Sequence, residues 1–236
     1  MALPKIAIPT FTAILPSTKK EIVFRPFVVK EEKVLLVAME SKDIDHMQRA
    51  MIDVLSSCIL TEDIDVNKLS SFDIEYLFLK VRSKSVSEEV TLSYRHVDGV
   101  NYEGDKCEAI TEVKINLDDV EVKFDDDHSP LIKLTDTMVL KMRYPTVKDL
   151  KIGNPTDDGM ELVARCVESV YDNEDVFDPD DIEDAKRFLG SLSNQQFLSV
   201  MKFFETMPTI QHTVSYKCPG CGQHDTVTLK GLSDFF

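Results

Sequence analysis

The sequence predicts an α+β protein, because its helix-like and strand-like segments come in blocks and do not alternate strictly. Short N-terminal segments alternate apolar and polar residues, as strands do. About six later segments repeat apolar residues at helical spacing. Two similar β-hairpins are expected at about 88–117 and 211–230, where alternation flanks turn-forming residues.

The N-terminal segment contains IAI, FTAIL and EIVFRPF, interrupted by Pro4, Pro9 and Pro16. Proline lacks the backbone N–H that a strand donates to its neighbour, so we expect short strands in an edge hairpin.

Helical spacing begins near Lys30 and predicts two helices, divided near residues 41–43. A third helix is predicted over 70–85, where Ser70 and Asp73 have the spacing of a capping box.

Alternation returns in 88–96 and 109–117, which form the first predicted hairpin, and residues 131–145 predict one or two further strands. Thr146 and Asp149 suit the start of a short helix.

An amphipathic helix is predicted over 159–172, followed by helices in 178–192 and 193–207. Ser193 and Gln196 have capping-box spacing at the start of the last one. The chain is then one mixed unit, 1–236, or two sub-domains: 1–145 with the first hairpin, and 146–236 with helices and the C-terminal hairpin.

The charge balance restricts the partners. With 27 Lys and Arg against 42 Asp and Glu, the formal net charge is −15, which repels phosphate backbones and anionic membranes. We therefore expect neither nucleic acid nor membrane as a partner. The acidic runs at 122–128 and 170–185 favour solvated surface, with a patch for a basic partner as the alternative.

The compartment is predicted to be reducing and cytosolic. The five cysteines do not form a dense even framework, and the N-terminal segment has no apolar core of signal-peptide length. No stretch approaches the roughly 20 apolar residues of a membrane span.

The segment YKCPGCGQHD, residues 216–225, resembles half of a zinc site. Cys218 and Cys221 are separated by Pro219 and Gly220, a spacing that lets both thiolates face one tetrahedral ion. Zinc takes four ligands, so two more are needed.

The other two ligands are suggested by an internal similarity. Aligning VTLSYRH and CEAITEVKINL with the C-terminal hairpin matches Tyr94 to Tyr216 and Val113 to Val227. Each hairpin then has a ligand-type residue two positions after its tyrosine and another six before its valine. These four residues are His96, Cys107, Cys218 and Cys221.

Three cysteines and one histidine would make a closed structural zinc site with no open position for catalysis. A metal-free hairpin stays an equal alternative, because β-composition alone can produce such a match. His212 and His224 are rival ligands. Redox chemistry is disfavoured, since no βαβ pattern surrounds the two cysteines.

No catalytic motif is present: GxGxxG, GxxxxGK[ST], GxSxG and HExxH are all missing. His128 follows three aspartates and is expected to be solvated. We therefore expect no enzymatic activity.

Several segments resemble one family: residues 1–41, FDIEYLFLKVRSKSV, MVLKMRYPT and VTLKGLSDFF. They are similar to T4-like bacteriophage baseplate hub subunits, also called baseplate hub assembly proteins. FRPFVVKEEK and FDIEYLF are the most specific parts, and the resemblance spans the chain.

The resemblance implies a non-enzymatic structural or assembly protein of the central hub of a contractile phage tail baseplate. It implies other hub and tail proteins as partners, with the tape measure protein as one candidate, and a location in the host cytoplasm during assembly. Whether the protein stays in the virion tail baseplate or leaves as a chaperone is left open. A protein-binding adaptor with a structural zinc hairpin is the remaining alternative.

Overall fold

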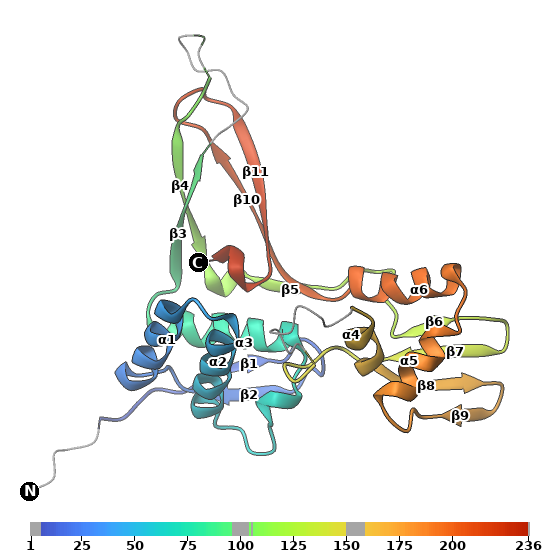
Figure 1. Ribbon diagram of the computed structural model, residues 1–236. Helices are drawn as coiled ribbons and strands as arrows, with labels where there is room; N and C mark the ends of the chain where they lie inside the picture. The colour runs from blue at the N-terminus through green and yellow to red at the C-terminus, as the bar shows by residue number, and fades with distance from the viewer. Residues whose placement is uncertain (1–5, 96–103, 105, 150–158, 236) are drawn as a thin grey trace, which may run out of the picture.

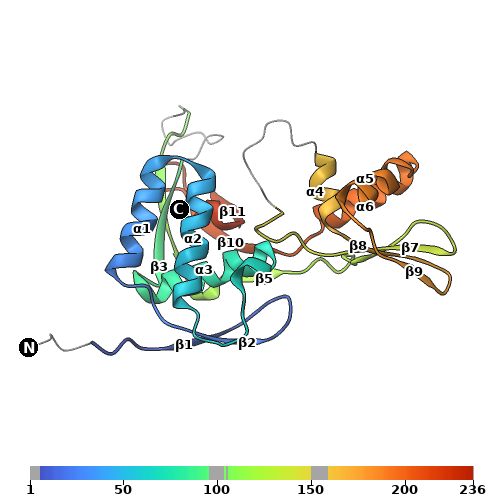
Figure 2. The same ribbon diagram turned by 60° about the horizontal axis from the view of Figure 1, so that its bottom comes forward.

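A computed structural model describes residues 6–95, 104, 106–149 and 159–235. Two lobes lie at opposite ends of the molecule, and a pair of long hairpins rises from the N-terminal lobe (Figure 1). The view in Figure 2 separates the same two lobes, with α1–α3 in one and α4–α6 in the other.

The N-terminal lobe packs three helices against a two-stranded sheet. Its elements are β1 (Phe11–Ile14), β2 (Glu21–Phe24), α1 (Val29–Ser41), α2 (Ile44–Cys58) and α3 (Ser71–Ser85). Its core joins apolar side chains of the hairpin, α2 and α3, with Ile22, Leu55 and Leu77 fully buried. The predicted hairpin and the predicted break after α1 are confirmed.

The start of α3 differs from the predicted capping box. Ser70 is the N-cap, but its hydroxyl donates to the Asp73 carboxylate at 2.6 Å and makes no hydrogen bond to a backbone N–H. Asp73 is fully buried and also accepts from the backbone N–H of Ser17 at 3.0 Å. The pair therefore ties the β1–β2 turn to α3.

The C-terminal lobe is a four-stranded antiparallel sheet with helices on it. The strands, in spatial order, are β6 (Leu131–Lys133), β7 (Met138–Met142), β8 (Val167–Asp172) and β9 (Asp175–Phe177). The helices are α4 (Gly159–Arg165), α5 (Ile182–Gly190) and α6 (Asn194–Glu205). The capping box of Ser193 and Gln196 is confirmed.

One helix prediction in this region is wrong, and most of a second lies outside the described residues. The helix expected over 159–172 ends at Arg165, and Val167–Asp172 forms β8. The segment pairs with β7, which is distant in the sequence, and with β9, which follows directly, and this pairing outweighs its local helical pattern. Residues Thr146 to Asp149 form a turn, in which Asp149 accepts from the Thr146 backbone N–H at 2.8 Å. The residues after it, 150–158, lie outside the described part.

Both predicted long hairpins are present: β3 (Glu89–Arg95) with β4 (Ile110–Asn116), and β10 (Thr209–Lys217) with β11 (His224–Lys230). The short strand β5 (Glu121–Lys123) pairs with β10, so one three-stranded sheet links residues that follow the first hairpin to the second hairpin. A third core lies between the hairpins and α3, with Ile115, Ile210 and Phe235 fully buried.

An aromatic cluster joins the lobes. The Phe72 ring, on α3, lies 5.0 Å from that of Tyr144, and the Tyr144 ring stacks on those of His128 and Phe203. His128 bonds Thr206 Oγ1 and the Tyr144 hydroxyl, each at 3.0 Å, and burial lowers its pKa. The expectation that His128 is solvated is therefore wrong.

The α+β class, with six helices and two similar hairpins among the described residues, is confirmed. The division into sub-domains 1–145 and 146–236 stays a prediction.

Candidate metal centre

The two hairpins pair in the register that the sequence similarity predicts. Val113 lies opposite Leu92 in the first hairpin, and Val227 lies opposite Val214 in the second. The matched tyrosines face each other across the hairpins: the Tyr94 and Tyr216 rings stack with centroids 5.7 Å apart and planes 16° apart. The strands of the two hairpins are therefore paired in the same register, and the matched tyrosines are in contact.

The CPGC segment forms a tight turn at the end of β10. The Cys218 N–H donates to the Gln223 carbonyl at 2.8 Å, and the Gly222 N–H donates to the Cys218 carbonyl at 2.9 Å. Gly222 has a φ of 74°, which favours glycine.

Close packing of the two tips requires small residues. A Cβ at Gly220 would lie 2.7 Å from the Ala109 Cβ and 3.1 Å from the Cys107 sulfur. Any side chain at Gly220 would therefore push the first hairpin's tip away from the turn. Spacing in the sequence did not reveal this contact between Gly220 and Ala109.

Three thiols meet at this point: the sulfurs of Cys107, Cys218 and Cys221 all lie within 4.8 Å of one another. The Cys107 and Cys218 sulfurs are 3.6 Å apart. Zn–S bonds of about 2.3 Å in a tetrahedron put two sulfurs about 3.8 Å apart. Cys107 and Cys218 are each only 1% exposed. The cluster can therefore hold a metal ion without rearrangement of that pair.

The electrostatics of the turn favour a thiolate at Cys218. Desolvation alone would raise its pKa, but hydrogen bonds from the backbone of Cys221 and Gly220 and from the Cys107 and Cys221 thiols lower that pKa to about 6. For Cys221, a backbone hydrogen bond at Gln223 lowers the pKa, but desolvation and the other two sulfurs outweigh it and raise the pKa. A thiolate is therefore favoured at Cys218, and the thiolate is the metal-binding form.

The remaining cysteines are chemically different. Burial raises the pKa of Cys58 to about 11 and that of Cys166 to about 12, which keeps both as neutral thiols. Each lies in an apolar core, Cys58 in the N-terminal lobe and Cys166 in the C-terminal lobe.

The structure brings together three of the four predicted ligands, whereas His96 lies outside the described residues. Neither rival histidine belongs to the described cluster. His212 lies opposite Leu229, six residues before Cys218, which corresponds to roughly 20 Å along a strand. His224 lies opposite Lys217 and is exposed.

None of the helices in the described residues combines the length and the apolar character that crossing a bilayer requires.

Comparison with known proteins identifies the family. Residues 8–236 match the family model described as T4 bacteriophage base plate protein. The chain is 24% identical over 214 residues to the baseplate hub assembly protein gp26 of Enterobacteria phage T4, an alignment that covers 90% of each chain. No solved structure matches. Because the family model covers nearly the whole chain, this protein belongs to the T4 bacteriophage base plate protein family.

Proposed function

We propose that the protein is a non-enzymatic structural or assembly component of the central hub of a contractile phage tail baseplate. The family match over residues 8–236 carries this proposal. The similarity to a baseplate hub assembly protein over 90% of both chains supports the hub as its place of action.

A groove in the N-terminal lobe is consistent with a non-enzymatic role. It has a volume of about 680 Å³ and lies between β1 and α3. Three of its charged residues are held in contacts at one end: Lys84 contacts the Asp118 carboxylate at 2.6 Å, and Lys80 donates to the Asp118 backbone carbonyl at 2.8 Å. An acid or base held in such contacts is poorly placed to move a proton on a substrate.

The proposed partners are other hub and tail proteins, with the tape measure protein as a candidate, and the assembly takes place in the host cytoplasm. The net charge of −15 argues against nucleic acid as a partner.

Deletion of the gene from the phage tests the role. We expect infected cells to lack complete tails in electron micrographs, and a plasmid copy to restore them. Mass spectrometry of purified restored virions then separates the two forms of the proposal. Peptides from this protein indicate a resident subunit, and their absence indicates a chaperone. Complete tails formed without the protein would overturn the proposal.

We also propose that Cys107, Cys218 and Cys221 bind a structural zinc ion, with His96 as the fourth ligand. The sulfur spacing and the low pKa of Cys218 support the three thiolates. His96 is supported by the hairpin register in the sequence alone. The ion would hold together two tips whose cysteines are 111 residues apart.

Elemental analysis of protein made in zinc-supplemented medium tests this site, with about one zinc per chain expected. Cys218→Ser should remove the metal, and Cys166→Ser, a buried cysteine elsewhere, should retain it. Cobalt substitution of His96→Gln, His212→Gln and His224→Gln identifies the fourth ligand, because only loss of a ligand changes the tetrahedral absorption bands. A wild-type stoichiometry near zero would leave the metal-free hairpin as the correct alternative.

A further inference from the structure

A second groove lies on the C-terminal lobe, between the sheet and α5, with a volume of about 210 Å³. Apolar side chains from both sides line it: Met138, Val167, Val170, Phe177, Ala185 and Phe188. Asp172, Asp178 and Asp184 complete the lining. The groove is thus apolar inside and carries carboxylates.

The groove opens beside an unprotected sheet edge. β9 is the last strand in the order β6-β7-β8-β9, so no described strand pairs with its outer side. Val176 and Phe177, on this strand, are 55% and 57% exposed. Unpaired backbone groups beside exposed apolar side chains are what an added strand recognises.

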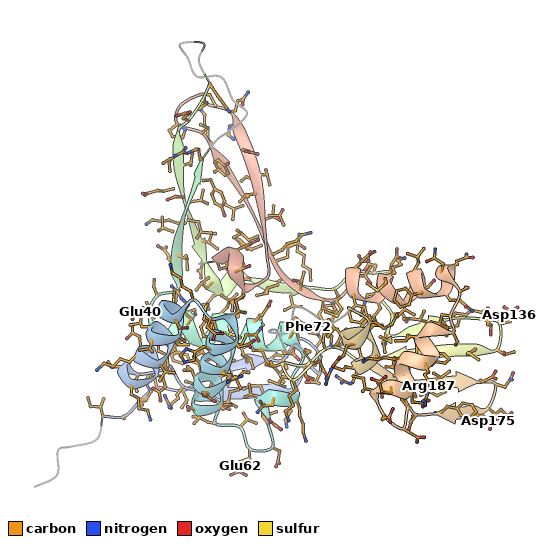
Figure 3. The ribbon with its side chains drawn as sticks, in the orientation of Figure 1. Glu40, Glu62, Phe72, Asp136, Asp175 and Arg187 are labelled. Atoms are coloured by element: carbon orange, nitrogen blue, oxygen red, sulfur yellow. The ribbon has the colours of Figure 1, made fainter. Side chains whose placement is uncertain are left out.

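The negative charge around the groove favours a positively charged occupant. Residues 170–185 contain eight Asp and Glu and no Lys or Arg. Only two of these acids, Glu183 and Asp184, pair with the lysine and arginine that follow on α5, at 3.0 and 3.1 Å. Figure 3 places Asp175 at the outer end of the lobe and Arg187 farther in. Six of the eight acids therefore have no ion pair among the described residues, and this region keeps a negative charge.

We propose that this groove and the open edge of β9 dock an extended, cationic segment of another baseplate protein. The segment adds to β9 as a strand, and an apolar side chain on its inward face enters between the sheet and α5, against Phe177. Its lysines or arginines face the surrounding carboxylates. The proposal rests on the assembly role proposed above, which makes the partner a protein.

One extended segment can place an apolar side chain in the groove and basic side chains near the carboxylates, because side chains alternate along a strand. Successive side chains point to opposite faces, so a segment that alternates apolar and basic residues places its apolar groups in the groove and its charges outside. Complementary charge speeds association and excludes acidic competitors, while the apolar contact supplies affinity.

The test uses a fluorescein-labelled peptide, acetyl-Lys-Val-Lys-Phe-Lys-Val-Lys-amide, and fluorescence anisotropy with the full chain. The comparison peptide replaces each Val and Phe by Ser and keeps the charge. We expect the apolar peptide to bind at least about tenfold more tightly, because only its Val and Phe side chains can bury apolar surface in the groove. Equal binding of both peptides would mean attraction by charge alone and would overturn the proposal.

Variants locate the binding. Phe177→Ser and Asp178→Asn should each weaken binding of the apolar peptide several-fold. Leu36→Ser, which alters an exposed apolar residue on α1, and Asp126→Asn, in the other acidic run, are the matched controls and should not change it. Circular dichroism melting confirms that each variant is folded. An unchanged affinity in Phe177→Ser overturns the proposal.

Phage assembly distinguishes this proposal from the role on which it rests. If the deletion phage lacks tails but the wild-type protein does not bind the apolar peptide, the docking groove is overturned and the assembly role stands. If tails form without the protein, the assembly role itself is overturned.

Discussion

The two long hairpins share a register but differ at their tips. Ile115 of β4 and Leu229 of β11 occupy equivalent positions, and both are buried in the same core. Residues 96–109 connect the first pair of strands, whereas only residues 218–223 connect the second. Alternation thus determines how strands pair and pack, while tip length is free to vary because closing a longer loop adds little entropic cost.

The bases of the hairpins differ as well. The first is tied to α3, since Lys84 contacts Asp118 at 2.6 Å and Ser83 donates to the same carboxylate at 2.9 Å. The second is held by backbone pairing to β5, where Ile210 lies opposite Val122. One hairpin is therefore anchored by side-chain charge and the other by sheet extension.

The largest effect is expected at the tips, where the hairpins differ most. If zinc is bound, a chelator should lower the free energy of unfolding by about 4 kcal/mol when free zinc had been 1,000-fold above its dissociation constant. Urea unfolding with and without chelator measures this. Cys107→Ser should abolish the response, and the Cys58→Ser control should retain it. A chelator response that persists in Cys107→Ser would place the metal elsewhere.

Substitution at the equivalent core positions tests whether the hairpins contribute equally. Ile115→Ala and Leu229→Ala should each lower the free energy of unfolding by about 2–5 kcal/mol, through lost burial and the cavity left behind. Ile110→Ala, at an exposed position of β4, should change it by less than about 0.5 kcal/mol. Chemical denaturation gives all three values. If only one of the two core substitutions markedly lowers the free energy of unfolding, the hairpins share a register but do not contribute equally to stability.

The tyrosine stack is expected to couple the hairpins more weakly. A double-mutant cycle with Tyr94→Leu and Tyr216→Leu should give a coupling energy of about 0.5–1.5 kcal/mol, typical of an aromatic pair. A second cycle, pairing Tyr94→Leu with Tyr171→Leu in the other lobe, is the control and should show additivity. Additivity in both cycles would mean that the two stacked tyrosine rings contribute no coupling energy.

The smallest effect concerns pH at the base of the first hairpin. Burial raises the pKa of Asp118, but hydrogen bonds from Lys84 and Ser83 outweigh it and lower that pKa. The stabilisation is therefore fully present above the unfolded-state pKa of about 3.9 and is lost as the pH falls through the lower folded-state value. Partial exposure of the pair limits it to less than about 1 kcal/mol.

Unfolding free energies of the wild type and Asp118→Asn, measured from neutral to acidic pH, should converge at the acidic end. The matched variant is Asp126→Asn, at an exposed position of the acidic run 122–128. A difference between wild type and Asp118→Asn that is constant across the pH range would assign the effect to packing instead of charge.

Local signals in the sequence predicted much of the fold. The break between α1 and α2 occurs at Lys42, whose φ of 53° ends the first helix, and Asp43 caps the second. Both lie within the predicted 41–43 boundary. The β8 segment could not be assigned this way, because Val163, Val167 and Val170 recur at helical spacing and continue the pattern of α4. Pairing with β7, which is distant in the sequence, and with β9, which follows directly, makes the segment a strand.

The alignment of the two hairpins predicted which cysteines form the candidate site. Matching the tyrosines and valines of the two hairpins makes Cys107 equivalent to Cys221 and predicts that it joins Cys218 and Cys221 in one cluster, as the structure shows. The register does not predict how closely the two hairpin tips approach each other. That distance depends on the small size of Gly220 and Ala109. Register also does not predict the partial burial of His128, which arises from packing of its ring against those of Tyr144 and Phe203.

The contact between Cys107 and Cys218 also sets an order of events on the ribosome. The two residues are separated by 111 positions, so at synthesis rates of about 5–20 residues per second the first thiol emerges roughly 5–20 s before the second. During that interval the first hairpin can pair its own strands, but its tip has no partner. The thiol cluster can therefore close only after the second hairpin has been synthesised, long after the strands of the first hairpin can pair.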